Sequence, residues 1–237
     1  STNADVLEKL YDKHPIIEKI MEYRHLTKLK NAYCDGMEGL IDNEGRIHSV
    51  FNQTVTVTGR ISSTEPNLQN IPTRTALGRE LRKMFTAPDD EHILVDADYS
   101  QIELRVLAHI ADDEVMKNAF LNGEDIHAVT ASQVFNTPLE EVSSEQRSAA
   151  KAVNFGIVYG ISSYGLANQL GITNGQAKDF MERYLSTYPK VMEYMNQNIE
   201  FAKQNGYSKT YYGRIRRINE ISSLNKNMAM FGERVAM

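Results

Sequence analysis

Two capping boxes fix where two long helices of this chain begin, and they constrain its fold more than any other feature. In a capping box, a Ser or Thr at the N-cap and a Glu or Gln three residues later each bond the other's backbone N–H. Ser143 with Gln146, and Thr173 with Gln176, meet this pattern. The sequence therefore predicts helices over residues 144–159 and 173–204. The second should break at Pro189, because the residue before a proline is pushed away from the α region.

The remainder of the chain adds helices and a little strand. Helices are predicted over residues 4–12 and 15–40, directly after residue 98, and from about Ser222 to the end. The alternating, β-branched residues 45–58 predict a hairpin or paired short strands, and residues 92–98 (HILVDAD) predict a buried strand. Residues 59–75 are expected to form a loop, and Gly171 a hinge. The expected fold class is α+β, mostly helical, with one small sheet.

Composition excludes several classes of protein. A chain of 237 residues with 41% hydrophobic residues can bury one or two cores. A single cysteine, Cys34, leaves no disulfide framework and no Cys/His zinc spacing, which fits a reducing compartment. No window approaches the roughly 18 apolar residues that span a bilayer, and the first residues lack a signal-peptide pattern. We therefore expect a cytoplasmic monomer with no membrane partner.

Charge is unevenly distributed along the chain. The formal net charge is −5, which argues against a nucleic-acid partner when taken alone. However, residues 203–217 hold five basic residues and no acid, and residues 60–83 hold five basic residues against two acids. Two basic segments on an acidic body suit a protein that holds DNA in a groove. Ordinary solvated faces are the alternative explanation.

Four side chains recur every fourth residue in the first capped helix. Arg147, Lys151, Phe155 and Tyr159 therefore form a slowly turning stripe, about 18 Å long at ~1.5 Å per residue. The two cations lie at the N-terminal end, where the helix dipole also favours phosphate. An extended triphosphate with its base toward the aromatics would match this layout. A solvated basic turn followed by a core aromatic pair is the alternative.

The letters of this helix, RSAAKAVNFGIVYG, resemble motif B of the bacterial DNA polymerase I family, also called family A DNA polymerases. The resemblance implies that Arg147 and Lys151 hold the phosphates of an incoming deoxynucleoside triphosphate (dNTP), with Lys151 also catalytic. It implies that Phe155 packs on the sugar and base, and that Tyr159 guards the insertion site. Phenylalanine rather than tyrosine at position 155 implies poor acceptance of dideoxynucleotides.

The end of the predicted strand at residues 92–98 suits a metal. Phosphoryl transfer to a primer 3′-hydroxyl calls for Mg²⁺ on hard carboxylate ligands, and Asp98 meets that description. DADYSQIELRVLAH resembles the family's motif A, which implies that Asp98 binds both Mg²⁺ ions and that the Tyr99 carbonyl assists. The resemblance also assigns Gln101 to dNTP binding and makes Glu103 a gate against ribonucleotides. Asp96 falls at a variable position and is not assigned to the metal.

The segment TGRISSTEPNLQNIPTR also resembles the family. This resemblance places Arg60 at the minor groove of primer and template, and Gln69 and Asn70 at the backbone or minor-groove edges. Arg74 is placed on the triphosphate side. Contacts of this type sense duplex geometry rather than sequence. Taken on its local pattern alone, the segment is equally a turn-rich loop.

Further positions follow from the same resemblance. His127 in GEDIHAVTA resembles the histidine that contacts the β-phosphate, although a lone histidine near a helix start is more often a surface or capped residue. Tyr164, Gly165 and Arg234 match template-side positions and are assigned to DNA binding. The run YYGRIRR resembles the basic turn that follows the fingers.

The resemblance covers the whole chain and predicts its organisation. Residues 1–44 would be part of the thumb, and residues 45–110 part of the palm with motif A. Residues 111–205 would be the fingers with the motif B helix at 144–160, and residues 206–237 would return to the palm. Motif C, a His-Asp-Glu turn that supplies the second metal carboxylate, does not occur in the sequence. We therefore expect a polymerase-domain fragment that is inactive in isolation.

The expected activity of the parent protein is template-directed DNA synthesis from dNTPs on a primer–template, by two-metal phosphoryl transfer. A noncatalytic dNTP- or DNA-binding fragment is one alternative. A single-subunit RNA polymerase is another, although Glu103 and Phe155 argue against it. A nuclease comes third, because a second acidic cluster is lacking.

Overall fold

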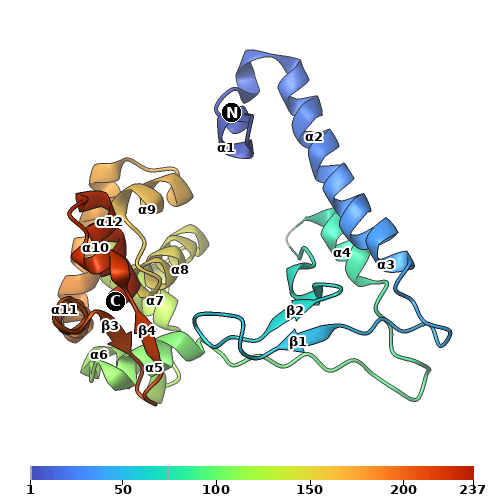
Figure 1. The fold of residues 1–237 in the computed structure, drawn as a ribbon. Coiled ribbons are helices and arrows are strands. Elements are labelled where there is room, and N and C mark those ends of the chain that lie inside the picture. Colours follow the sequence, from blue (N-terminus) through green and yellow to red (C-terminus); the bar gives the residue numbers. More distant parts are fainter. Residues whose placement is uncertain (1, 74) are drawn as a thin grey trace. The chain divides into compact units, whose positions relative to one another are not determined.

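The computed structural model describes residues 2–73 and 75–237. The chain divides into two compact units, Ser1–Asp96 and Ala97–Met237. Helices dominate, and the described residues contain two two-stranded antiparallel sheets (Figure 1). The expected α+β, mostly helical class is confirmed, whereas the expectation of one sheet is wrong.

A long helical run opens the first unit. After α1 (Ala4–Glu8) and the 3₁₀ turn η1 (Tyr11–Lys13) come α2 (Pro15–Leu29), the π-helical turn η2 (Lys30–Asp35) and α3 (Gly36–Glu38). The helix expected over residues 15–40 is therefore confirmed as a nearly continuous run, while the one expected over 4–12 already ends at Glu8. Pro15 occupies the first turn of α2, where its missing N–H costs nothing.

The first sheet differs from the predicted one. Strand β1 (Val50–Asn52) pairs with β2 (Ser62–Thr64), with Phe51 opposite Ser63. The hairpin expected within residues 45–58 is wrong, because residues 54–58 belong to the connection between the strands. That connection turns back at Gly59, whose φ is +79° and whose N–H bonds the Thr56 carbonyl at 3.2 Å. A φ above zero is readily available only to glycine.

The first unit is completed by the 3₁₀ turn η3 (Leu68–Asn70) and α4 (Ala76–Arg82). Residues 59–75 are therefore not simply a loop, because they contain β2 and η3. A small core forms where the long helical run meets this segment. Its buried members are Leu29, Tyr33 and Met37, packed against partly buried Ile47, Leu68, Ile71, Leu81 and Phe85. The Tyr33 hydroxyl donates to the Asn70 carbonyl, which ties the run to η3.

The strand expected over residues 92–98 is wrong. This segment forms no strand, and Ile93, Leu94 and Val95 are 83%, 69% and 80% exposed. A strand is stabilised only by pairing, and no described segment pairs with this one. An apolar run indicates a tendency to form a strand, but it does not identify the strand with which that segment would pair.

The second unit is a helical assembly. Its helices are α5 (Ile102–Ile110), α6 (Glu114–Leu121), α7 (Ile126–Phe135), α8 (Ser144–Val158), α9 (Ser163–Leu170), α10 (Asn174–Thr187), α11 (Pro189–Asn205) and α12 (Lys226–Ala236). Both capping boxes are present, and the predicted break at Tyr188-Pro189 separates α10 from α11. Gly171 caps α9 in the left-handed conformation. The last helix begins at Lys226 rather than near Ser222.

A large core around α7 and α8 holds α5 to α11 together, and a second, smaller cluster of Ala202, Ile218, Ile221 and Ala236 joins α12 to the end of α11. The fully buried side chains of the large core include Leu104, Met116, Ile126, Val134, Val153, Leu166, Tyr184, Tyr188 and Val191. The 3₁₀ turn η4 (Leu139–Glu141) lies between α7 and α8. Beyond α11 the chain forms a hairpin of β3 (Tyr207–Lys209) and β4 (Ile215–Arg217), and the 3₁₀ turn η5 (Asn219–Ser222) follows before α12. None of the helices in the described residues is long and apolar enough to cross a membrane.

Candidate functional site

Helix α8 presents the predicted stripe from a firmly fixed start. The Ser143 side chain accepts from the Gln146 N–H at 3.2 Å, and the Gln146 side chain accepts from the Ser143 N–H at 2.9 Å. One face of the helix is buried through Ala150, Val153, Asn154 and Ile157. The adjoining side leaves the cationic turn exposed at the end of the helix where the dipole attracts anions.

The aromatic half of the stripe meets α5. The rings of Phe155 and Tyr159 are stacked, with centroids 6.3 Å apart and planes 12° apart, and Tyr159 is 60% exposed. The Tyr159 hydroxyl donates to Glu103 Oε1 at 3.4 Å. The structure therefore brings together two residues that were predicted from separate motifs, one for the insertion site and one for the ribonucleotide gate.

The cationic half of the stripe has an acidic neighbour. Arg147 Nε contacts Asp125 Oδ2 at 2.5 Å. Asp125 is also the N-cap of α7, where it accepts from the His127 N–H at 2.9 Å. Burial raises the pKa of Asp125, but the hydrogen bonds from Arg147 and from the His127 N–H outweigh burial and hold the pKa below its ordinary value. Asp125 was not predicted, although its place before the helix at Ile126 is typical of an N-cap.

Lys151 lies one turn further along α8 and is exposed. Within the described part of the chain it makes no ion pair, so its ammonium group is available to a bound anion. The two cations of the stripe therefore differ, because Arg147 already contacts a carboxylate and Lys151 does not.

His127 lies beneath the stripe and is 2% exposed. Its ring centroid is 5.6 Å from that of Phe155, and its Nδ1 is 3.0 Å from Asn154 Nδ2. Burial lowers the pKa of His127 to about 4, with Arg147 and Lys151 lowering it further and Asp125 opposing them. At neutral pH the ring is therefore uncharged, and it can act as a hydrogen-bond donor but not as a cation.

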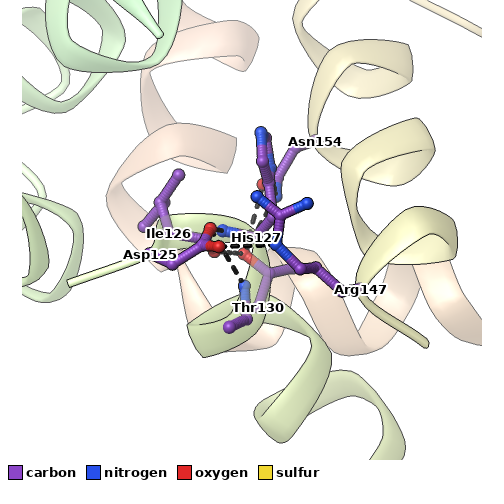
Figure 2. Close-up of polar contacts among 7 residues, drawn as sticks. Asp125, Ile126, His127, Thr130, Arg147 and Asn154 are labelled. Atoms are coloured by element: carbon purple, nitrogen blue, oxygen red, sulfur yellow. Dashed lines mark hydrogen bonds and ion pairs between the residues drawn. The ribbon is translucent and has the colours of Figure 1, made fainter. Parts of the chain in front are cut away.

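Asn154 belongs to a buried polar cluster that the sequence did not reveal. Figure 2 shows His127 and Thr130 of α7 facing Asn154 of α8, with Arg147 and Asp125 beside them. Thr130 Oγ1 also lies 3.0 Å from the Tyr188 hydroxyl. The contacts between α7 and α8 span more than 20 residues of sequence, so no local pattern could have indicated them.

The predicted metal-binding segment is open to solvent. Asp98 and Tyr99 are exposed, and they precede α5 without being part of a strand. Gln101 caps α5 in the left-handed conformation, with φ at +55°. No group of three or more His, Cys, Asp or Glu side chains suited to a metal occurs among the described residues. Among the described residues, Asp98 is therefore an exposed carboxylate that belongs to no such group.

The predicted template-side residues gather where α8 ends. Tyr164 is exposed in the first turn of α9, and the Gly165 N–H bonds Ser162 Oγ at 3.2 Å. A Cβ on Gly160 would lie 3.0 Å from the Arg234 carbonyl oxygen, so α12 packs closely against the turn after α8. Arg234 itself lies over the Phe231 ring, 5.8 Å from its centroid.

Of the predicted residues that belong to the first unit, three are described. The Arg60 carbonyl accepts from the Thr56 hydroxyl, and the Gln69 side chain donates to the Ile61 carbonyl at 3.1 Å. Asn70 accepts from Tyr33 through its carbonyl. Arg74 lies outside the described residues. These side chains and the α8 site belong to different units.

The basic segment at residues 203–217 forms the β3–β4 hairpin and its approach. Lys203 is paired with Glu200 and Glu233 at 3.2 and 2.9 Å. Lys209, Arg214 and Arg217 are exposed and make no ion pair within the part of the chain that the structure describes. In the turn of the β3–β4 hairpin, Tyr211 and Tyr212 are 73% and 96% exposed. The hairpin therefore offers cations and aromatic rings together.

Comparison with known proteins agrees with these observations. The family model described as DNA polymerase family A matches residues 1–237. The DNA polymerase I of Geobacillus stearothermophilus is 50% identical over 238 residues, and that of Caldicellulosiruptor bescii is 49% identical. Each match covers 100% of this chain, but only 27% and 28% of those relatives.

A solved structure shares the fold. It is described as the POL domain of Pol1 from M. smegmatis in complex with DNA primer-template and dNTP, and it is 41% identical with a TM-score of 0.87. The match covers 100% of this chain and 42% of that one. With a family model matching from end to end, the chain belongs to DNA polymerase family A.

Proposed function

We propose that the protein containing this chain performs template-directed DNA synthesis, and that this chain supplies its dNTP-binding helix and one metal-binding carboxylate. The observation that carries the proposal is the α8 stripe. Lys151, open and unpaired within the described chain, lies between Arg147 and the stacked rings of Phe155 and Tyr159. Cations at a helix N-terminus favour phosphate, and an aromatic face favours a base or sugar.

The other predicted residues receive roles in the same proposal. His127 and Arg74 act on the triphosphate with Gln101, and Glu103 blocks a 2′-hydroxyl next to Tyr159. DNA contacts come from Arg60, Gln69, Asn70, Tyr164, Gly165 and Arg234. The organisation into thumb (1–44), palm (45–110), fingers (111–205) and returning palm (206–237) is part of the proposal. So are a cytoplasmic location and a monomeric state.

Mg²⁺ is the proposed metal, and the residues present fit a partial site. Mg²⁺ is usually bound through one or two carboxylates and completes its shell with waters and substrate phosphates. Asp98 supplies one exposed carboxylate, and the Tyr99 carbonyl is a neighbouring oxygen ligand. When bound, the metal would lower the pKa of the primer hydroxyl and bind developing negative charge. This chain would contribute Asp98 as one ligand of the metal, and a second carboxylate elsewhere in the polymerase would be the other.

A noncatalytic role is the second candidate, and one observation favours it. The described residues contain no cluster of carboxylates that could hold two metals. In that case the isolated chain would bind dNTP and DNA without extending a primer. Selective binding of a ribonucleoside triphosphate would instead favour an RNA polymerase.

Binding of dATP to the isolated chain tests the proposal directly. We expect saturable binding that falls about tenfold or more in Lys151→Ala, since a hydrogen bond to a charged group contributes about 1.5–3 kcal/mol. The matched control is Lys178→Ala, on the exposed side of α10, where the ammonium pairs with Glu182 at 3.6 Å. Equal loss in both variants, or no binding by the wild-type chain, would refute the proposal.

A further inference from the structure

Asn154 is a fully buried polar side chain near the proposed nucleotide site. It is 0% exposed on α8 and faces His127 and Thr130 of α7 (Figure 2). A buried amide is costly unless its hydrogen-bonding groups are satisfied. The partners of this amide therefore determine which way it points and which atoms it can serve.

The direction of the hydrogen bonds is fixed at the Ile126 carbonyl, which can only accept. Thr130 Oγ1 lies 2.7 Å from that oxygen and donates its single proton to it. The approach of Oγ1 to Asn154 Oδ1 is longer, at 3.2 Å, and competes less well. Thr130 Oγ1 must therefore accept from its other neighbours, which are the Tyr188 hydroxyl at 3.0 Å and Asn154 Nδ2 at 3.1 Å.

This orientation leaves the second proton of Asn154 Nδ2 for His127. The distance from Nδ2 to His127 Nδ1 is 3.0 Å, so Nδ1 accepts a hydrogen bond. A neutral imidazole carries one proton, and a ring whose Nδ1 accepts must carry it on Nε2. The tautomer of His127 thus follows from the orientation of the Asn154 amide, which places Nδ2 against both Thr130 Oγ1 and His127 Nδ1.

Nε2 is the edge of the ring that a ligand can reach. It makes no hydrogen bond with any described residue. Among the described residues, the side-chain atoms that are both buried and without a hydrogen-bond partner are Ser62 Oγ and Tyr184 Oη. His127 Nε2 has no partner and is not one of these buried atoms, so it remains in contact with solvent. Arg147 and Lys151, the cations of the proposed triphosphate site, act electrostatically on this ring.

We propose that Asn154 is a positioning residue for nucleotide binding, whose amide holds His127 in the tautomer that presents an Nε2–H donor to a phosphate oxygen. This inference rests on the proposed function for the identity of the acceptor. It goes beyond that function by giving a role to Asn154 and to the Thr130 hydroxyl that orients it. Neither residue touches the nucleotide in this arrangement.

The electrostatic surroundings are compatible with a neutral donor. Asp125 at the start of α7, and Arg147 and Lys151 of α8, are the charged groups that act on His127. Tyr188, from the junction of α10 and α11, faces Thr130, while Asp113 at the start of α6 acts on Tyr184 and Tyr188 instead. Burial disfavours the imidazolium form most, and the two cations add to this effect, so the tautomer rather than a positive charge determines what the ring offers.

Nitrogen-15 NMR of the histidine-labelled chain distinguishes the tautomers. The wild type is expected to show His127 protonated on Nε2 and unprotonated on Nδ1. In Asn154→Asp an acceptor replaces the donor at the same place, so Nδ1 is expected to gain a proton. The control Asn174→Asp, at an exposed position in the first turn of α10, should leave His127 unchanged. A wild-type ring protonated on Nδ1, or an Asn154→Asp ring with Nδ1 unprotonated, would overturn the proposal.

A second pair of variants decides the matter if Asn154→Asp does not fold. Thr130→Ser keeps the hydroxyl that orients the amide and should preserve the Nε2–H tautomer. Thr130→Val is similar in shape and lacks the hydroxyl, which frees the amide to turn, so it should admit the Nδ1–H form. An unchanged ring in Thr130→Val would overturn the proposal in that case.

Nucleotide affinity supplies a readout that a purely structural role would not change. Relative to wild type at each pH, Asn154→Asp should bind dATP about tenfold more weakly near pH 8, because Nε2 then faces phosphate without a proton. The loss should shrink toward about pH 5 as the ring becomes doubly protonated. A constant ratio would contradict the inference. If the wild-type chain shows the expected tautomer but binds no dATP, the proposed function fails while the role of Asn154 in fixing the ring stands.

Discussion

The buried, uncharged His127 makes a specific prediction about acid stability. Its pKa falls from the ordinary value of 6.5 to about 4 in the folded chain, chiefly because of burial. The folded state therefore binds fewer protons than the unfolded state between these two values. Stability linked to His127 is complete above pH 6.5 and is lost progressively as the pH falls toward 4.

The size of the loss follows from the pKa difference. At about 1.4 kcal/mol for each pH unit, the span from 6.5 to about 4 amounts to about 3 kcal/mol. Because the side chain is only 2% exposed, little of this is screened by solvent. Replacing His127 with glutamine removes the titration, so wild type should lose about 3 kcal/mol more than His127→Gln between pH 7 and pH 4.

Urea unfolding at both pH values measures this difference. Amide signals from α7 and α8 report on the second unit alone, which separates its unfolding from that of the first. The control is His109→Gln, an exposed histidine on α5 in the same unit, and its pH dependence should follow wild type. If His127→Gln and wild type lose equal stability on acidification, the account of a buried neutral imidazole is refuted.

Three further changes test other parts of the structure. Asp125→Asn keeps a good N-cap and removes the ion pair with Arg147. Because the partly exposed pair contributes at most about 1 kcal/mol, dATP affinity should rise up to about fivefold, and a fall in affinity would contradict this. Gly160 and Gly171 have nearly the same φ, +68° and +66°, but a Cβ at Gly160 would lie 3.0 Å from the Arg234 carbonyl oxygen while a Cβ at Gly171 would meet nothing within 4 Å. Gly160→Ala should therefore lower the Tm more than Gly171→Ala does, and equal losses would argue against that contact. Replacing Arg214 and Arg217 with alanine should flatten the salt dependence of DNA binding by about 1.8 in slope, at ~0.9 per phosphate contact, and an unchanged slope would exclude the hairpin from DNA binding.

Local signals in the sequence predicted local structure well. Ser143 with Gln146 fixed the start of α8, and Pro189 fixed the end of α10, because each acts on backbone atoms within one turn. The stripe on α8 was predicted for the same reason, since spacing within one helix determines which side chains share a face.

Non-local pairing could not be predicted in the same way. Residues 45–58 and 92–98 both have strand-forming composition, yet β1 pairs with Ser62–Thr64 and residues 92–98 pair with no described segment. Strand propensity depends on partners that the pattern does not name.

In the candidate site, too, local motifs could be predicted from the sequence and contacts between distant residues could not. The chemistry of Arg147, Lys151 and His127 was expected from motifs, whereas Asp125 and Asn154 were not. Arg147 and Asp125 are 22 residues apart in sequence, and Asn154 and His127 are 27 apart. Which polar groups meet across two packed helices depends on the packing itself, and a single sequence does not reveal it.

Primer extension by a chimeric polymerase tests the central claim most directly. The matching segment of the Geobacillus stearothermophilus DNA polymerase I, which is 50% identical over 238 residues, would be replaced by this chain. The chimera is expected to extend a primer with dNTPs in Mg²⁺. Asp98→Ala should slow extension roughly a thousandfold, because a metal contributes several kcal/mol of charge stabilisation. A chimera that binds primer–template and dNTP but adds no nucleotide, or an Asp98→Ala chimera that extends at the full rate, would contradict the account.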